Sequence, residues 1–164
     1  MKFWWVNQKQ THKEEVTGGF MWSPKQNVNG ARNQFYENMQ LVKPGDVIFS
    51  YYHGFIQNIG ISISNHESKS KPESFGRKGE NWNQEGWYVK VLYQPLKEKI
   101  SLEENLDTLS EHIPDKYAPF NSDGKVLERY LCSVPAQMGE ILIKSNNLSY
   151  DLIFLSSRIA KIYG

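Results

Sequence analysis

Short runs of aromatic and β-branched residues, separated by turn-forming sequences, occupy much of the chain. Runs of this kind, bounded by Gly, Pro, Asn and Asp, are typical of β-strands. We predict strands over residues 2–7, 46–53, 55–65, 87–93 and 127–134. Gly54, between the second and third of these, marks the best hairpin candidate. The pattern favours a small curled sheet or barrel of about five or six strands.

Hydrophobic residues recur at helical spacing in the segments between and after these strands. The predicted helices begin at Asn29 or Gly30 and end near 42, begin at the N-cap Ser101 and end near 113, and cover 135–143 and much of the tail after 148. The polar stretches 8–29 and 66–83 are predicted to be long loops, the first with one apolar island and the second basic and mobile. Strands with interspersed helices predict an α+β fold.

Length and composition fit one folded domain. The chain has 164 residues, 39% of them hydrophobic, and a single cysteine, Cys132. One cysteine excludes an intrachain disulfide framework and favours a reducing, cytoplasmic compartment. No run has the length and apolarity of a signal peptide or a membrane span, so no membrane role is predicted. We expect a domain over 1–147, and over 148–164 either a docking helix or the start of a linker.

The charge distribution is a weak indication of nucleic-acid binding. The net charge is +1, but residues 1–90 hold 11 Lys and Arg against 8 Asp and Glu, together with all five tryptophans. A small excess of this kind is usual for a solvated surface, and strong phosphate binders normally have a clear basic patch. Charge alone therefore does not identify a partner.

Residues with catalytic or metal-binding potential form no recognisable set. The chain lacks a phosphate-binding loop and a dinucleotide glycine fingerprint. The histidines at 12, 53, 66 and 112 lie in four different segments, none at a metal-ligand spacing. Cys132 in a predicted strand is expected to be a packing residue rather than a nucleophile. We predict no cofactor, no metal and no catalytic activity for this chain alone.

Aromatic side chains coincide with hydrogen-bonding ones in loops and at strand ends. Rings supply stacking faces and amides or hydroxyls supply edge contacts, which is how flipped or single-stranded bases are held. Strand alternation sends Trp4 and Trp5 to opposite faces, so we assign Trp4 to the core and Trp5 to a ligand. The candidate pocket residues are Trp5, Asn7, Trp22, Ser50, Tyr51, Tyr52, Trp82 and Trp87.

Five segments in the right order resemble the EVE domain, of the PUA-like group that includes the YTH and ASCH domains. They are Phe3-Trp4, Trp22 followed by Gly30-Ala31-Arg32-Asn33, Gly45-Asp46 with its aromatic strand, 56–61, and 87–93 followed by Ile100-Ser101-Leu102. The runs 4–8, 18–25 and 114–120 are similar to the N-terminal domain of EVE-HNH endonucleases. The resemblance implies a PUA-like curled sheet or pseudo-barrel with flanking helices.

The same resemblance implies a reader of modified DNA. In EVE-HNH enzymes the EVE domain flips 5-methyl- or 5-hydroxymethylcytosine out of double-stranded DNA, and a separate C-terminal HNH domain cuts. An HNH nuclease domain is thus a candidate partner in a longer chain. The expected contacts to the nucleic-acid backbone are Lys25, Arg32, Asn33, Arg77 and Lys78. Two alternatives stay open: a PUA-like RNA reader, and a small ASCH-like nuclease.

Overall fold

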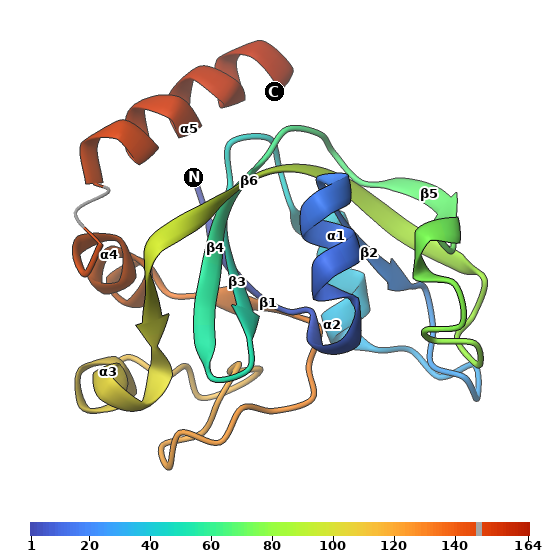
Figure 1. The fold of residues 1–164 in the computed structure, drawn as a ribbon, viewed down its shortest axis with the longest axis horizontal. Coiled ribbons are helices and arrows are strands. Elements are labelled where there is room, and N and C mark those ends of the chain that lie inside the picture. Colours follow the sequence, from blue (N-terminus) through green and yellow to red (C-terminus); the bar gives the residue numbers. More distant parts are fainter. Residues whose placement is uncertain (147–148) are drawn as a thin grey trace.

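A curled sheet forms the centre of the molecule (Figure 1). The structure is a computed structural model that describes residues 1–146 and 149–164. The strands follow the order β2-β6-β4-β3-β1-β7, and β5 pairs with β6 beside β2. Their bounds are β1 Phe3–Asn7, β2 Phe20–Pro24, β3 Val47–Tyr52, β4 Phe55–Ser62, β5 Glu67–Ser70, β6 Glu85–Ser101 and β7 Leu131–Val134. The predicted α+β fold with flanking helices is confirmed.

Five α-helices lie around this sheet in the described residues. They are α1 His12–Gly18, α2 Gln34–Glu37, α3 Leu102–Ser110, α4 Ala136–Lys144 and α5 Ser149–Tyr163. Short 3-10 turns cover Lys9–Thr11, Asn38–Leu41 and Glu73–Phe75. Ser101 caps α3 as predicted, because its hydroxyl accepts a hydrogen bond of 3.2 Å from the backbone N–H of Glu104.

Strand β6 connects the two halves of the sheet. Its 17 residues pair with β4 along one part and with β2 and β5 along the other. On the far side of β4, the hairpin at Gly54 leads back to β3, and β1 pairs with β3 in parallel. Gly54 has a φ of +86°, a conformation that favours glycine, so the predicted hairpin is confirmed.

Both faces of β1 are buried, which corrects the expectation for its two tryptophans. Trp4 is 1% exposed and its Nε1 donates to Oδ2 of Asp46 at 3.0 Å. Trp5 is 0% exposed and lies in the cluster closed by α3 and α4. Strand alternation predicts opposite faces correctly, but the helices α3 and α4 cover the face that carries Trp5 as well. Trp5 therefore needs no ligand to cover it.

Several predicted element boundaries were wrong. The segment 8–29 is not a loop, since it holds α1 and β2. The segment 66–83 contains β5 and the buried Phe75 as well as turns. The helix predicted from residue 29 or 30 starts only at Gln34, because Asn33 is its N-cap, and it ends in a 3-10 turn. The strand predicted over 87–93 is part of the longer β6.

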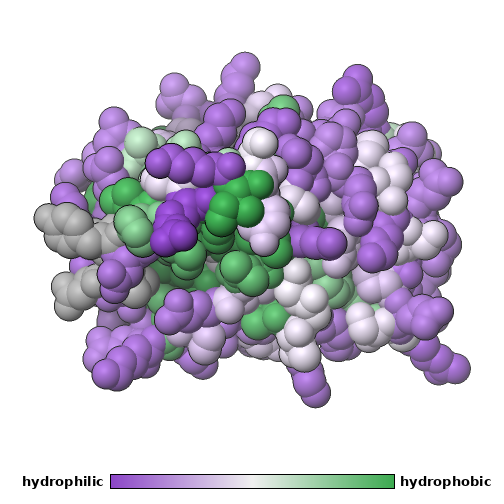
Figure 2. Space-filling view, turned by 90° about the horizontal axis from the view of Figure 1, so that it is seen from above, coloured by the Kyte–Doolittle hydropathy of each residue, from purple (hydrophilic) through white to green (hydrophobic). Residues whose placement is uncertain are grey.

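The tail forms a helix that packs against the domain. Ser156 and Ile159 of α5 are buried, and the Ser156 hydroxyl donates to the carbonyl oxygen of Gly45. The boundary predicted between residues 147 and 148 lies outside the described residues, so that division stays a prediction. The outward side of α5 exposes Ile153, Phe154, Leu155 and Ile162, and hydrophobic side chains gather on this face in Figure 2. No helix in the described ranges is long and apolar enough to cross a bilayer.

Candidate nucleic-acid interface

A hollow of about 100 Å³ lies where the two ends of the curled sheet approach each other. Tyr130, just before β7, joins these ends: its carbonyl oxygen accepts from the N–H of Asn7 at 2.8 Å, and its hydroxyl oxygen accepts from the N–H of Trp22 at 3.0 Å. The lining residues come from β1, β2 and nearby segments: Asn7, Gln8, Lys9, Gln10, Thr11, Trp22, Pro24, Tyr36, Trp82 and Tyr130. Three predicted pocket residues, Asn7, Trp22 and Trp82, are therefore brought together.

Two tryptophan rings form the aromatic side of this hollow. The centroids of Trp22 and Trp82 are 6.4 Å apart and their planes differ by 26°. Trp22 is 1% exposed, and its Nε1 donates to the carbonyl oxygen of Lys69 at 2.9 Å. Trp82 is half-buried on a segment closed by the 2.8 Å hydrogen bond from Lys71 N–H to the Gln84 carbonyl. One ring is thus fixed in the sheet, and the other belongs to a surface segment that covers it.

Gln8 forms the polar floor next to the rings and is almost fully buried. Its Oε1 accepts from the Ser50 hydroxyl at 2.6 Å, and its Nε2 donates to the Tyr93 hydroxyl at 2.8 Å. Tyr93 in turn donates to the carbonyl oxygen of Phe20 at 3.1 Å. The amide of Gln8 therefore has one fixed orientation. Ser50, a predicted pocket residue, acts behind Gln8 and does not line the hollow.

A buried carboxyl group, Glu15, supports the wall from behind. Its oxygens accept from the Trp22 N–H at 2.9 Å and from the Thr11 hydroxyl at 2.8 Å, and the Tyr130 hydroxyl also donates to it. Burial raises the pKa of Glu15 to about 8, an effect that outweighs these three hydrogen bonds. Burial likewise raises the pKa of Tyr130 well above its ordinary value. Glu15 thus connects α1 to the residues that carry both sides of the hollow.

Four predicted pocket residues lie elsewhere. Trp5 and Tyr51 stack on each other with centroids 5.2 Å apart in the core cluster of α3 and α4. Tyr52 stacks on His12, with centroids 4.6 Å apart. Trp87 follows Gly86 on β6, so it faces away from the side that Trp22 shares with Tyr88, its pairing partner. None of these four rings is among the residues that line the hollow.

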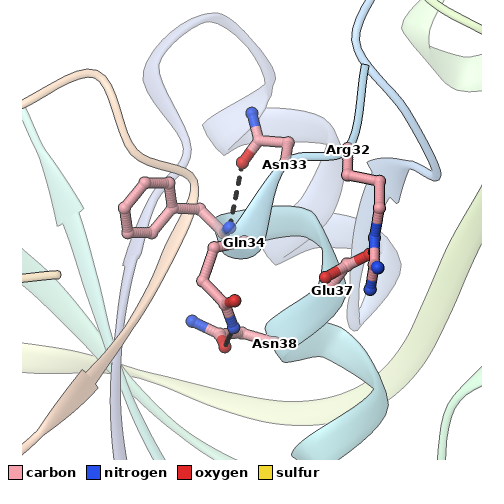
Figure 3. Close-up of polar contacts among 6 residues, drawn as sticks. Arg32, Asn33, Gln34, Glu37 and Asn38 are labelled. Carbon is pink, nitrogen blue, oxygen red and sulfur yellow. Dashed lines mark hydrogen bonds and ion pairs between the residues drawn. The ribbon is translucent and has the colours of Figure 1, made fainter. Parts of the chain in front are cut away.

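The predicted backbone contacts differ in their surroundings. Arg32 lies beside Glu37 (Figure 3) and forms an ion pair of 2.6 Å with it. Asn33, at the start of α2, accepts a 2.9 Å hydrogen bond from the N–H of Phe35. Lys78 forms an ion pair of 2.6 Å with Glu14. Arg32, Asn33 and Lys78 therefore already have structural contacts.

The two other predicted contacts make no ion pair in the described part of the chain. Lys25 lies with its Nζ 4.2 Å from the centroid of Trp87 and donates to the Ser68 hydroxyl at 2.8 Å. Arg77 is exposed. Of the predicted cations, these two have no carboxylate partner in the described residues.

Sequence reasoning missed Gln8, Glu15, Tyr36 and Tyr130. Glu15 and Tyr130 meet Trp22 from positions 7 and 108 residues away along the chain. The only signal in the sequence was the short spacing of Asn7 and Gln8 at the end of a strand. A polar helix such as α1 gives no periodic apolar pattern, so nothing indicated that Glu15 is buried.

Groups able to support metal or thiol chemistry are not assembled near the hollow. Among residues 1–146 and 149–164, no three His, Cys, Asp or Glu side chains are placed to hold a metal ion. Cys132 is buried in β7, and burial raises the pKa of its thiol to about 12. Its environment is that of a packing residue.

Comparisons with known proteins identify the fold. No family model matches the chain, and no curated protein matches it. The YTH domain of Pho92 in complex with m6A superposes with a TM-score of 0.54 and 13% identity, covering 92% of this chain and 87% of that chain. A protein from Pseudomonas putida gives a TM-score of 0.53 at 12% identity, covering 87% and 97% of the two chains.

A third similar structure is that of a mutant ZmASCH protein from Zymomonas mobilis. Its TM-score is 0.50 at 8% identity, and it covers 88% of this chain and 96% of that chain. At such low identities the likeness shows the fold alone. The chain therefore shares the α+β fold of the YTH and ASCH structures, the fold that the resemblance implied.

Proposed function

We propose that this chain reads a modified base in nucleic acid, and that the base is modified cytosine flipped out of double-stranded DNA. The observation that carries the proposal is the pair of tryptophan rings beside the hollow, one fixed in the sheet and one on a surface segment. The PUA-like fold supports it, because a YTH domain with the same fold has been crystallised in complex with m6A. That likeness does not assign a ligand to this chain.

A flat base fits this site if Trp82 moves outward. Bases stack at about 3.4 Å, so a base between two rings needs roughly 7 Å between them. The ring centroids are 6.4 Å apart and the ring planes differ by 26°, so Trp82 would have to shift and turn to open a parallel slot. Trp22 is held by Lys69 and Glu15, whereas Trp82 is carried by the segment 71–84. The base would therefore stack on Trp22 and be covered by Trp82.

The edge of the base would meet the polar side of the hollow. The side-chain nitrogen of Asn7 donates to the carbonyl oxygen of Leu127 at 3.4 Å. Its amide oxygen makes no hydrogen bond in the ranges that the structure describes, so it is available to accept from the exocyclic amino group of cytosine. Gln8 is fully engaged and orients the floor rather than the ligand.

The free energies of flipping, stacking and methyl burial indicate what each group must contribute to binding. Flipping a base costs a few kcal/mol, and stacking on rings returns about 1 to 3 kcal/mol per base. Net affinity must then come from phosphate contacts, for which Lys25 and Arg77 are available. Burying one methyl group contributes about 0.8 kcal/mol, less than a tenfold preference. Selection of a C5-modified cytosine therefore requires close packing around C5 when Trp82 covers the base.

We further propose the finer assignment that the resemblance to EVE-HNH enzymes implies. The preferred base is 5-methyl- or 5-hydroxymethylcytosine, and the chain on its own binds without cutting. In a longer chain this module would direct an HNH nuclease domain to modified sites.

Fluorescence titration tests the proposal with duplexes that differ at a single cytosine, which is unmodified, 5-methylated or 5-hydroxymethylated. We expect tighter binding of a modified duplex. Equal affinity for all three would contradict the reader. A matched RNA that binds better than the DNA would favour the RNA alternative. Metal-dependent cleavage of the duplex by this chain would favour the ASCH-like nuclease.

A further inference from the structure

A second hollow, of about 560 Å³, lies in the segment that precedes β7. Figure 1 shows this segment as the loop between α3 and β7, at the opposite end of the molecule from α5. Ile113 and Phe120 give the hollow apolar walls, and Tyr117 and Arg129 also line it. The run 114–120, conspicuous in the sequence, contributes half of this lining and plays no part in the tryptophan pocket.

Tyr117 presents its ring to solvent at the rim of this loop hollow. Its φ of +63° lies in the left-handed region, which is disfavoured for residues with a side chain. The residue is 52% exposed although its ring contacts Phe35, with centroids 5.8 Å apart and planes at 78°. A large ring held outward on an unfavourable backbone is available as a stacking surface.

Arg129 supplies positive charge to the same hollow. Its guanidinium carbon lies 4.8 Å from the centroid of Phe35, and its Nη1 donates to the carbonyl oxygen of Ala118 at 2.7 Å. No ion pair neutralises it in the described residues, so its other N–H groups can donate to a phosphate. Lys116 adds a second cation, and Asp115 is the one carboxylate among the lining residues.

The loop hollow and the tryptophan pocket are neighbours. Leu127 lines the loop hollow, and its carbonyl oxygen is the acceptor of the Asn7 side chain, which lines the pocket. Arg129 immediately precedes Tyr130, which also lines the pocket. Tyr36 lines the pocket too, and its ring contacts that of Tyr130 with centroids 6.5 Å apart. The segment 127–130 thus contributes residues to both hollows.

We propose that the loop hollow is a second nucleotide subsite, which binds the nucleotide next to the flipped base in the same strand. The neighbouring base stacks on the ring of Tyr117, and its phosphate is bound by Arg129. The inference rests on the proposed function, since it uses a base flipped beside Trp22 to place the strand. It adds a site that would sense the sequence or stacking strength of the flanking position.

The test combines a protein variant with a modified substrate. Tyr117→Gly removes the ring and suits the left-handed backbone, so the variant is expected to fold. Variant and wild type are both titrated with two modified duplexes. One duplex has a single abasic position on the 5′ side of the modified cytosine, and the other has it on the 3′ side. On the intact duplex we expect Tyr117→Gly to lose roughly five- to a hundredfold in affinity. At one flanking position the abasic site should remove this difference between variant and wild type.

Two controls accompany this experiment. Phe154 is another exposed ring near an arginine, with 5.7 Å between its centroid and the guanidinium carbon of Arg158. It lies on α5, away from the loop hollow, and Phe154→Ala removes it. This variant should leave binding unchanged. Tyr117→Phe keeps the ring and should bind like the wild type.

The outcomes separate the subsite from the reader. The losses in binding free energy caused by Tyr117→Gly and by an abasic site can simply add at both flanking positions. The subsite is then wrong, whether or not the wild type prefers modified DNA. If the wild type shows no preference for modified DNA but the coupling appears at one position, the reader is wrong and the subsite stands as a nucleotide site without modification selectivity.

Discussion

Two of the stacked pairs of aromatic rings, Trp5 with Tyr51 and Trp22 with Trp82, look equivalent in the sequence and differ in the structure. Trp5 and Tyr51 both lie on strands, and Phe120 closes their cluster with its centroid 5.3 Å from that of Trp5. Trp22 lies on a strand, but its partner Trp82 belongs to a surface segment and both rings line a hollow. The difference teaches that the same pairing of rings can close a core in one place and border a surface hollow with polar neighbours in another.

The largest expected effect separates the two pairs by stability. Trp5→Ala should lower the free energy of unfolding by about 3 to 5 kcal/mol, because Trp5 is 0% exposed and its removal leaves a cavity. Chemical denaturation measures this loss, with the half-buried Trp82→Ala as the comparison. A smaller loss for Trp5→Ala than for Trp82→Ala would contradict the assignment of Trp5 to the closed cluster.

The second effect concerns the carboxyl group behind the Trp22 wall. The folded state raises the pKa of Glu15 from 4.5 to about 8, so it retains a proton that the unfolded chain releases. The stability from this proton is complete below pH 4.5 and is lost as the pH rises to about 8. Glu15→Gln should therefore flatten the pH dependence of unfolding in this range and stabilise the protein at about pH 8, by an amount of the order of a few kcal/mol.

Glu14 offers a matched control, because the folded state lowers its pKa instead of raising it. A hydrogen bond from Lys78 lowers the pKa of Glu14, so its contribution is lost as the pH falls rather than as it rises. Glu14→Gln should leave the slope of unfolding free energy against pH unchanged between roughly pH 5 and 8, because that interval lies above the ordinary carboxyl pKa. Identical slopes for wild type and Glu15→Gln would show that Glu15 is ionised in the folded protein.

The third effect is on binding. Trp82→Ala should weaken binding of a modified duplex by about 1 to 3 kcal/mol, because it removes one of the two stacking faces. Trp87→Phe is the control, since Trp87 is also half-buried, lies on the opposite face of the sheet, and this change keeps a ring beneath Lys25. Titration with modified and unmodified duplexes measures both. Equal losses for the two variants would remove the pocket assignment from Trp82.

The smallest effect distinguishes available cations from paired ones. Lys25→Ala should reduce the slope of log affinity against log salt by about 1, as expected for the loss of one phosphate contact. Arg32→Ala should change the slope little, because Glu37 already neutralises Arg32. Anisotropy titrations over a range of salt concentrations provide both slopes. A larger change for Arg32→Ala would reverse their roles.

Much of the sheet could be predicted from the sequence because strands alternate. β1, β3, β4 and β7 contain the aromatic or β-branched runs that indicated them. α1 was missed because its buried residue is Glu15, so no apolar periodicity marks it. β2 appeared only as an apolar island, because its strand of five residues follows directly after α1.

The candidate site was predicted in part for a different reason. Trp22, Trp82 and Asn7 could be named from their residue types and their places in loops or at strand ends. Trp5 could not be excluded, because alternation does not reveal that a curled sheet has a covered second face. Tyr130 could not be found, since its contact with Trp22 joins residues 108 positions apart. Long-range contacts of this kind leave no local signal.

The continuous β6 strand makes the two halves of this protein interdependent. One part of it supplies the hydrogen bonds of β2, on which Trp22 lies, and the other part supplies those of β4. A chain cut in the middle of β6 would leave each fragment with an unpaired sheet edge. Two such pieces would complete the sheet, and with it the strand that carries Trp22, only when they are brought together.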